Sequence, residues 1–246
     1  MAQSFFIWNG IDCRAKGIIM QGPAAIIRPE ERVNHVEIPG RAGDLTETEG
    51  ENIYNSYIQT ASISVRGGSY RVREIYRWLR GSGYVTFSGE PDRRQKARVI
   101  GAITLNKHSR NRDNWEGEVQ FYCQPLKERL SYSEIAVTSG DVVRNEGDVE
   151  SRPRWRIKTK ANLGASETVT LTVAGGNTIT LTGAESAKWY LIDADTMTVT
   201  NWDLQTVQSN YTNLSSGDFP VLAVGENTVT YTNATELHVL TRERFL

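Results

Sequence analysis

The sequence is poor in the features that build cross-linked or membrane-spanning proteins. Its 246 residues include only two cysteines, Cys13 and Cys123, which are too few for a disulfide framework and fit a chain that matures in a reducing cytoplasm. No apolar run approaches the roughly 18 residues of a membrane span, and the first residues lack the basic and apolar regions of a secretory leader. We therefore expect neither secretion nor insertion into a membrane.

The chain also lacks an excess of charge of one sign. It has 28 lysines and arginines against 29 acidic residues, a formal net charge of −1, which gives no general reason to expect binding to nucleic acid or to an anionic membrane. The three histidines, His35, His108 and His238, lie far apart and without the spacing of metal ligands. We therefore predict no bound metal, no cofactor and no sequence-specific contact with nucleic acid.

Signatures of catalysis are equally scarce. Asp193 and Asp195 could be the carboxylate pair of a glycoside hydrolase, but acids two residues apart in a threonine-rich turn are typical of a solvated loop. The thiol of Cys13 could be activated by Arg14, yet no histidine lies near it in the sequence to act as a base. No Cys-x-x-Cys, His-Glu-x-x-His, Gly-x-Ser-x-Gly or Walker sequence is present. We predict that the protein is not an enzyme and has no catalytic residue.

The composition changes near Leu130. Residues 1–130 carry a net charge of +4 and five threonines, whereas residues 131–246 carry −5 and 18 threonines. Threonine is β-branched and favours a pleated, half-solvated surface, so the second part is expected to be almost purely β. We predict two domains, 1–130 and 131–246.

The second part alternates between aliphatic residues and threonine, as half-buried strands do. Segments 168–173 and 178–182 show this pattern most clearly, and Gly175, Gly176 and Asn177 between them are typical of a short hairpin connection. Further strands are expected at 198–200, 227–232 and 236–241. Several short strands at this spacing predict a β-sandwich or jelly roll.

The first part mixes strands with one helix. The helix is predicted over 70–81, where Val72, Ile75, Tyr76 and Leu79 form one apolar stripe and Gly81 suits the position after the helix end. Its arginines could contact nucleic acid, but a solvated face of a helix lying on a sheet is the favoured interpretation. Strands are expected at 5–8, 17–19, 32–38, 60–65, 84–87, 97–105 and 115–122.

The sharpest local signature is segment 38–45, Ile-Pro-Gly-Arg-Ala-Gly-Asp-Leu. Pro39 and Gly40 suit the central positions of a type II turn, because proline fixes φ and glycine accepts a positive φ. Arg41 then presents its guanidinium at the turn, and Gly43 allows a second bend. Taken alone, the pattern indicates a rigid hairpin tip.

Together with its surroundings, this segment resembles the distal tail protein (Dit) family of long-tailed, non-contractile bacteriophages (siphoviruses). The resemblance covers nearly the whole chain and rests on the order and spacing of its pieces, because each piece alone is mostly turns between strands. The pieces are segments 8–18, 30–33, 39–43, 77–92, 145–153 and 219–231.

The resemblance implies a structural protein of the virion tail tip, or baseplate. Members of the family form a hexameric ring whose N-terminal domains stack on the tail tube protein on one side and the tail-associated hub protein on the other. Their galectin-like C-terminal β-sandwiches project outward and can hold a receptor-binding protein. The implied fold is therefore mainly β, with an N-terminal β-sandwich-like domain that carries one helix and a protruding hairpin. We expect assembly in the host cytoplasm, passage of DNA through the ring without base readout, and Pro39, Gly40, Arg41 and Gly43 as the candidate inter-subunit element.

A carbohydrate-binding, lectin-like module that contacts the host surface is the alternative. Trp189, Trp202 and Tyr211, with Tyr190, lie in the second part, and Trp189, Trp202 and Tyr211 are the candidates to stack on sugar rings. Large aromatic rings in a sandwich mostly fill the core, so burial of these rings is favoured. The chain is also short for the family, which leaves little room for a dedicated sugar-binding insertion.

Overall fold

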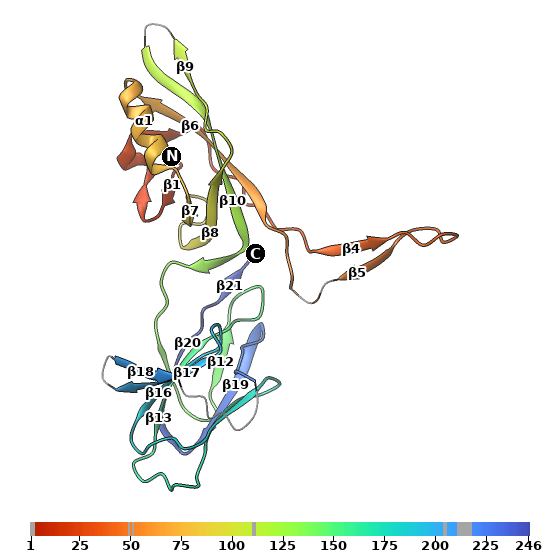
Figure 1. Ribbon diagram of the computed structural model, residues 1–246, viewed down its shortest axis with the longest axis vertical. Coiled ribbons are helices and arrows are strands. Elements are labelled where there is room, and N and C mark those ends of the chain that lie inside the picture. The colour runs from red at the N-terminus through yellow and green to blue at the C-terminus, as the bar shows by residue number, and fades with distance from the viewer. Residues whose placement is uncertain (1–2, 49, 51, 110–111, 204–205, 211–217) are drawn as a thin grey trace. The chain divides into compact units, whose positions relative to one another are not determined.

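The computed structural model describes residues 3–48, 50, 52–109, 112–203, 206–210 and 218–246. These residues divide into two compact units: unit 1 comprises Met1–Leu130 with Leu246, and unit 2 comprises Ser131–Phe245. Strands dominate both units (Figure 1), which confirms the mainly β fold class. None of the helices in the described ranges is long and apolar enough to cross a bilayer.

Unit 1 is built on one antiparallel sheet. Its strands lie in the order β2-β1-β7-β8-β10-β6-β3, and β9 also pairs with β10. The elements are β1 (Phe6–Trp8), β2 (Ile11–Asp12), a 3-10 turn η1 (Cys13–Lys16), β3 (Ile18–Met20), β4 (Val33–Val36), β5 (Leu45–Thr48), β6 (Tyr57–Arg66), α1 (Ser69–Trp78), β7 (Ser82–Phe87), β8 (Arg93–Ile100), β9 (Leu105–Ser109) and β10 (Arg112–Arg129).

The core of unit 1 is aromatic and lies between the curled sheet and α1. Phe6 and Trp8 are fully buried against Phe121, with ring centres 5.4 Å and 5.5 Å away, and Trp78 of α1 stacks on Phe6 at 5.8 Å. Such pairs add to the free energy of burying their apolar area. The long strand β10 carries the shared ring of Phe121 and therefore organises the core.

The predicted helix is present, with two corrections. Val72, Ile75 and Leu79 are buried as expected, but Tyr76 is 37% exposed and its hydroxyl accepts a hydrogen bond from the backbone N–H of Leu105. The helix ends at Trp78 with Leu79 as its cap, so Gly81 lies one residue beyond the position predicted for it. The N–H of Leu105 gives the Tyr76 hydroxyl a hydrogen-bond partner in this exposed position.

The expected strands of unit 1 are present, with extents that differ from those predicted. Segment 97–105 was predicted as one strand, but β8 ends at Ile100 and β9 begins at Leu105, because Gly101 takes a left-handed φ of +70° that breaks the pleat. Strand 32–38 is shorter than expected, and its hairpin partner β5 has too little alternation to be predicted.

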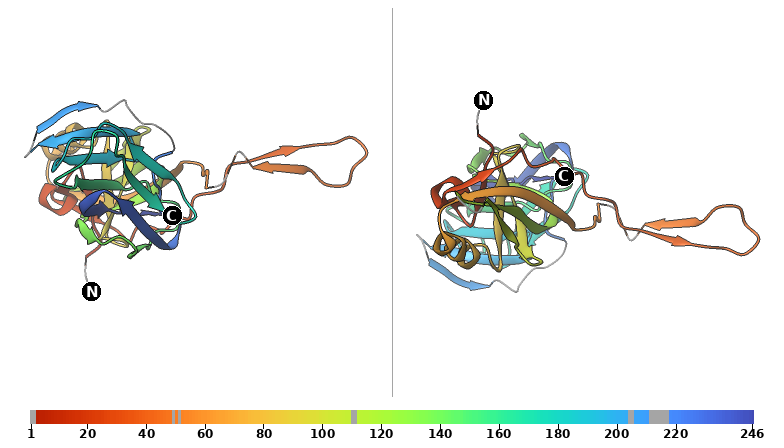
Figure 2. Two further views of the ribbon diagram at one scale, coloured as in Figure 1. Left: turned by 90° about the horizontal axis from the view of Figure 1, so that it is seen from below. Right: turned by 90° about the horizontal axis from the view of Figure 1, so that it is seen from above.

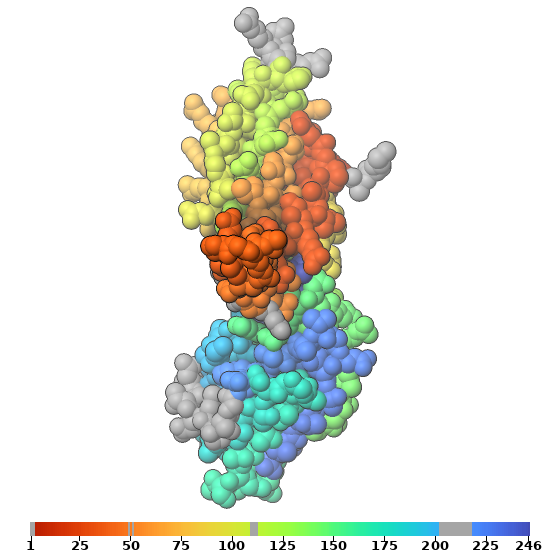
Figure 3. All heavy atoms as spheres, turned by 90° about the vertical axis from the view of Figure 1, so that its right-hand side faces the viewer, coloured from red at the N-terminus to blue at the C-terminus, as the bar shows by residue number. Residues whose placement is uncertain are grey.

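Strands β4 and β5 form a separate two-stranded sheet. In Figures 1 and 2 this hairpin extends away from the rest of unit 1, and Figure 3 shows it end-on as a compact group of orange spheres. Val36 pairs with Leu45, and Val33 pairs with Thr48. We call residues 30–48 the arm. The protruding hairpin of the predicted fold is thus confirmed.

Unit 2 is a sandwich of two antiparallel sheets with the strand orders β11-β20-β13-β16-β17-β18 and β12-β19-β14-β15. Its elements are β11 (Ile135–Val137), β12 (Val142–Asn145), β13 (Arg154–Thr159), β14 (Val169–Val173), β15 (Thr178–Leu181), β16 (Trp189–Asp193), β17 (Thr198–Asp203), β18 (Thr206–Asn210), β19 (Gly225–Thr232), β20 (Ala234–Leu240) and β21 (Arg244–Phe245).

Both sheets of unit 2 contribute to one core. Trp155 and Tyr190 from the larger sheet are fully buried together with Leu171 and Ile179 from the smaller one. The two large polar rings are satisfied inside, because Trp155 Nε1 donates to the carbonyl of Pro220 at 3.1 Å and the Tyr190 hydroxyl accepts from the N–H of Glu185 at 2.7 Å. The predicted sandwich and the predicted burial of Tyr190 are confirmed.

Candidate interaction surfaces

The arm ends in the turn that the sequence predicts. The N–H of Arg41 donates to the carbonyl of Ile38 at 3.1 Å, and Gly40 has a φ of +84°. The ring of Pro39 holds its own φ negative, so the positive φ lies at Gly40, the second central position. This combination defines a type II turn. Gly43 takes a second left-handed φ of +83°, so the tip is shaped by backbone geometry.

The arm has no core of its own. None of its residues is buried, and only Val33 and Leu45 are partly covered. Val36 and Ile38 expose 43% and 39% of their surface. An isolated two-stranded hairpin is at best marginally stable in water, so an ordered arm of this length needs a surface to pack against. Pro39, Gly40, Arg41 and Gly43 all lie exposed at its tip, where their inter-subunit role stays a prediction.

The arm and the rest of unit 1 carry opposite charges. Residues 30–48 contain five acidic residues and two arginines, a net charge of −3. Residues 1–29 and 49–130 contain 17 basic and ten acidic residues, a net charge of +7. The basic character of the first part of the chain therefore belongs to the sheet and helix, and the arm is acidic.

The two carboxylates considered for catalysis are held by arginines. Arg242 binds both oxygens of Asp193 at 2.8 Å, and Arg244 binds Asp195 at 2.5 Å. The N–H groups of Asp195 and Thr196 also donate to Asp193 Oδ1, which makes Asp193 the residue that closes the turn after β16. The predicted turn is confirmed, and both side chains serve structural ion pairs.

The environment of Asp193 favours its charged form. Burial by itself raises the pKa of this carboxyl, but the hydrogen bonds and positive charge of Arg242, with the two backbone N–H donors, outweigh burial and leave the pKa below its ordinary value. A general acid for glycoside hydrolysis needs a raised pKa. Asp193 is therefore unsuited to that role.

Cys13 is not an activated thiol. It is fully buried, and burial raises its pKa. Arg14, which could have activated this thiol, forms an ion pair with Asp12 at 2.5 Å. A buried thiol with a raised pKa is a poor nucleophile.

Trp189 lies on the outer face of the larger sheet in unit 2, where its ring is only half-buried. The expectation that it fills the core is wrong, because its neighbour Tyr190 occupies the inward position and successive residues of a strand face opposite ways. The guanidinium of Arg156 lies 4.9 Å from the centre of the Trp189 ring, and the ammonium of Lys158 lies 5.5 Å from it. Cations therefore cover part of the ring that a sugar would stack on.

For Trp202 and Tyr211, the other two candidates for contact with sugar, the structure describes less. The backbone of Trp202 in β17 pairs with that of Trp189, so the two positions are neighbours across strands. Tyr211 lies outside the described residues, and so does the side chain of Trp202. Their proposed contact with sugar stays a prediction.

The histidines occupy strand surfaces. His35 is exposed on the arm, and His238 lies half-buried with its ring 5.7 Å from that of Trp189. Both side chains therefore face outward from their strands. In the described ranges, no three His, Cys, Asp or Glu side chains come together as metal ligands would.

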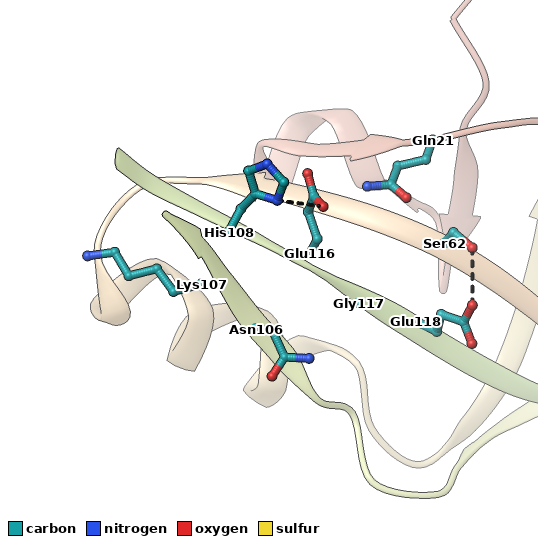
Figure 4. Close-up of a pocket in the computed structure, with 8 residues that line it drawn as sticks. All are labelled: Gln21, Ser62, Asn106, Lys107, His108, Glu116, Gly117 and Glu118. Carbon is teal, nitrogen blue, oxygen red and sulfur yellow. Dashed lines mark hydrogen bonds and ion pairs between the residues drawn. The ribbon is translucent and has the colours of Figure 1, made fainter. Parts of the chain in front are cut away.

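A polar hollow of about 450 Å³ lies on unit 1 beside β9 and β10. In Figure 4, His108 points toward Glu116, with Nδ1 of the histidine 3.4 Å from a carboxylate oxygen, and Ser62 donates to Glu118 at 3.5 Å. Both acids thus have partners from neighbouring strands. Gln21, Asn106, Lys107 and Gly117 complete its lining.

The similarity of this chain to known proteins lies in its three-dimensional structure. No protein-family model matches the sequence, and no curated protein does. The SPP1 Dit (gp 19.1) protein, described as a paradigm of the hub adsorption apparatus in phages that infect Gram-positive bacteria, has a similar structure. The match covers 100% of both chains with a TM-score of 0.80 at 17% sequence identity.

A chain of the phage P2 baseplate, in its activated conformation with Ca, is also similar in structure. That match covers 97% of both chains with a TM-score of 0.50 at 8% identity. The full-length agreement with SPP1 Dit includes both units and the arm, which is the combination that the sequence resemblance implied. The chain therefore has the fold of the phage distal tail (Dit) proteins.

Proposed function

We propose that the protein is a structural component of a bacteriophage tail tip. In this role it forms a hexameric ring that joins the tail tube protein to the tail-associated hub protein, and it holds receptor-binding proteins through unit 2. The observation that carries the proposal is the fold shared with SPP1 Dit over 100% of both chains. The virion tail tip is then its location, reached after assembly in the host cytoplasm, and DNA passes through the ring without base readout.

The physical properties of unit 1 suit this role. A closed ring needs head-to-tail contacts in which one patch of a subunit meets a different patch of the next. The arm supplies one such patch, since it is exposed along its length and oppositely charged to the rest of its unit. The structural ion pairs at Asp193 and Asp195 and the inert thiol of Cys13 agree with a protein that has no reacting centre.

Imaging and mass measurement test the ring. We expect negative-stain images of the full chain to show six-fold rings, alone or with the tube and hub proteins, and native mass spectrometry to show hexamers. Replacing residues 33–48 by a short Gly-Ser loop should abolish the ring and leave the melting temperature of unit 2 unchanged. A chain that stays monomeric at high concentration with both partners present contradicts the proposal.

A lectin-like role of unit 2 is the second candidate, and the half-exposed ring of Trp189 is the observation that favours it. A glycan array tests this candidate. If the role is real, Trp189→Ala abolishes binding while Tyr70→Ala, which removes a ring that is 70% exposed on α1, leaves binding intact. The absence of binding by the unmodified protein excludes the candidate.

A further inference from the structure

A second hollow in unit 1, of about 580 Å³, opens over β7, β8 and β10. Its lining is mostly apolar and includes the rings of Tyr84 and Tyr122, with Lys96 and Arg98 on the strand between them. Tyr122 exposes 42% of its surface, and Ile58, its register partner on β6, exposes 49%. We call the surface formed by Tyr84, Tyr122, Ile58, Lys96 and Arg98 the tyrosine groove.

The groove is firmly built. The N–H of Tyr84 donates to Asn9 Oδ1 at 2.9 Å, and its carbonyl accepts from the N–H of Asn9 at 2.9 Å. The guanidinium of Arg94 lies 4.4 Å from the centre of the Tyr84 ring and also pairs with Glu128 at 3.5 Å. The backbone of Tyr84 is therefore held by two hydrogen bonds to Asn9, one to its side chain and one from its N–H, and the Tyr84 ring makes one cation–π contact.

Two positive charges in the groove have no counter-charge. Register places Arg98 directly between Ser82 and Tyr122, and Lys96 opposite Tyr84. Both side chains are exposed, and none of the described residues forms an ion pair with either of them. An apolar surface with two unpaired cations suits an extended segment that carries apolar and acidic residues on one face.

One face of the arm has this chemistry. Val36 pairs with Leu45 and Asn34 pairs with Glu47, and paired residues lie on the same face of a two-stranded sheet. This face therefore combines two aliphatic side chains with a carboxylate. Within the described residues, Glu47 has no ion-pair partner.

We propose that the arm of one subunit docks in the tyrosine groove of the next, a contact that rests on the ring proposed above. Val36 and Leu45 cover the rings of Tyr84 and Tyr122, and the Glu47 carboxylate pairs with Arg98 or Lys96. In Figure 2 the arm points away from the sheet of its own unit, so the groove that receives it belongs to a second copy. The net charges of −3 on the arm and +7 on the rest of unit 1 favour the same pairing.

Charge reversal in the full chain tests the pairing. Arg98→Glu and Glu47→Arg should each weaken self-association about 10-fold in sedimentation velocity, and the double variant should recover most of the loss. Arg73→Glu, which reverses an exposed charge on α1, is the matched control and should have little effect. Single variants that associate like the unmodified protein overturn the proposal.

Cross-linking gives a second readout that does not depend on charge. The variant with Val36→Cys and Tyr122→Cys should form disulfide-linked multimers under mild oxidation, whereas Val36→Cys with Tyr70→Cys should not. If rings form but this link does not, the groove receives another tail protein, the docking proposal fails and the ring proposal stands. If the unmodified chain never associates with itself, the ring and the docking fail together.

Discussion

Replacing Asp193 by asparagine removes one charge from unit 2 while keeping most of the local geometry. The carboxylate of Asp193 accepts two hydrogen bonds from Arg242, both 2.8 Å long. The side chain of Asp193 is 13% exposed, and that of Arg242 is 27% exposed. Asparagine retains the oxygen that accepts from the N–H groups of Asp195 and Thr196. The substitution therefore isolates the ion pair from the turn.

The expected loss of stability follows from this partial burial. Exposed ion pairs contribute about 0.2–1 kcal/mol, and breaking a buried pair costs about 3–5 kcal/mol. The Asp193 pair lies between these limits, so we expect Asp193→Asn to lower the free energy of unfolding by about 2 kcal/mol. For a unit of this size that loss corresponds to a melting temperature roughly 6–10 °C lower.

Differential scanning calorimetry of the full chain at pH 7 measures this change in the transition of unit 2. Asp195→Asn is the matched control, because its single ion pair with Arg244 involves a side chain that is 45% exposed. The control should lower the free energy of unfolding by about 0.5 kcal/mol. Equal effects of the two substitutions would refute the reasoning.

The same pair predicts a pH dependence. Because the pKa of Asp193 is lowered in the folded state, its contribution is fully present above the ordinary carboxyl pKa of about 3.9 and is lost as the pH falls through the lowered value. The difference in unfolding free energy between the unmodified protein and Asp193→Asn should therefore be constant down to about pH 5 and shrink below about pH 4. A difference that grows in acid contradicts the assignment.

Two further predictions concern unit 1. Gly83→Ala should lower the free energy of unfolding by about 1–3 kcal/mol in a urea titration, because the new Cβ would lie 1.7 Å from Asn9 Oδ1 and break the hydrogen bond that this oxygen accepts from the N–H of Tyr84. The control is Gly22→Ala, whose new Cβ would have no atom within 4 Å, and it should leave the free energy of unfolding nearly unchanged. Cys13 and Cys123 should resist alkylation at pH 8 until the chain is denatured, because both thiols are buried and burial raises the pKa of Cys123 to about 12. Fast labelling of the native protein would contradict this structure.

The sequence was sufficient to predict features that local chemistry determines. The Pro39-Gly40 turn follows from the φ angles that these residues allow, and the hairpin around Gly175 follows from the alternation on either side of it. The buried stripe of Val72, Ile75 and Leu79 follows from helical spacing. In each case the signal lies within a few residues of the structure that it specifies.

The features that were missed depend on neighbours distant in sequence. Trp189 and Tyr190 alternate, and only the sheet that packs on them decides which ring is buried. The partners of Asp193 and Asp195 lie 49 residues further along the chain in each case. The tyrosine groove joins residues of β7, β8 and β10 that share no local motif, so no pattern in the sequence indicates it.

Strand β10 has a consequence for synthesis of the chain. It lies in the middle of the sheet, between β8 and β6, yet it is the last strand of unit 1 in chain order before Leu130. A nascent polypeptide on the ribosome therefore cannot close this sheet until nearly all of unit 1 has left the exit tunnel, and until then the edges of β6 and β8 stay open to pairing with other chains. Slow emergence of β10 should favour misassembly during expression, and pausing after residue 130 should favour a soluble product.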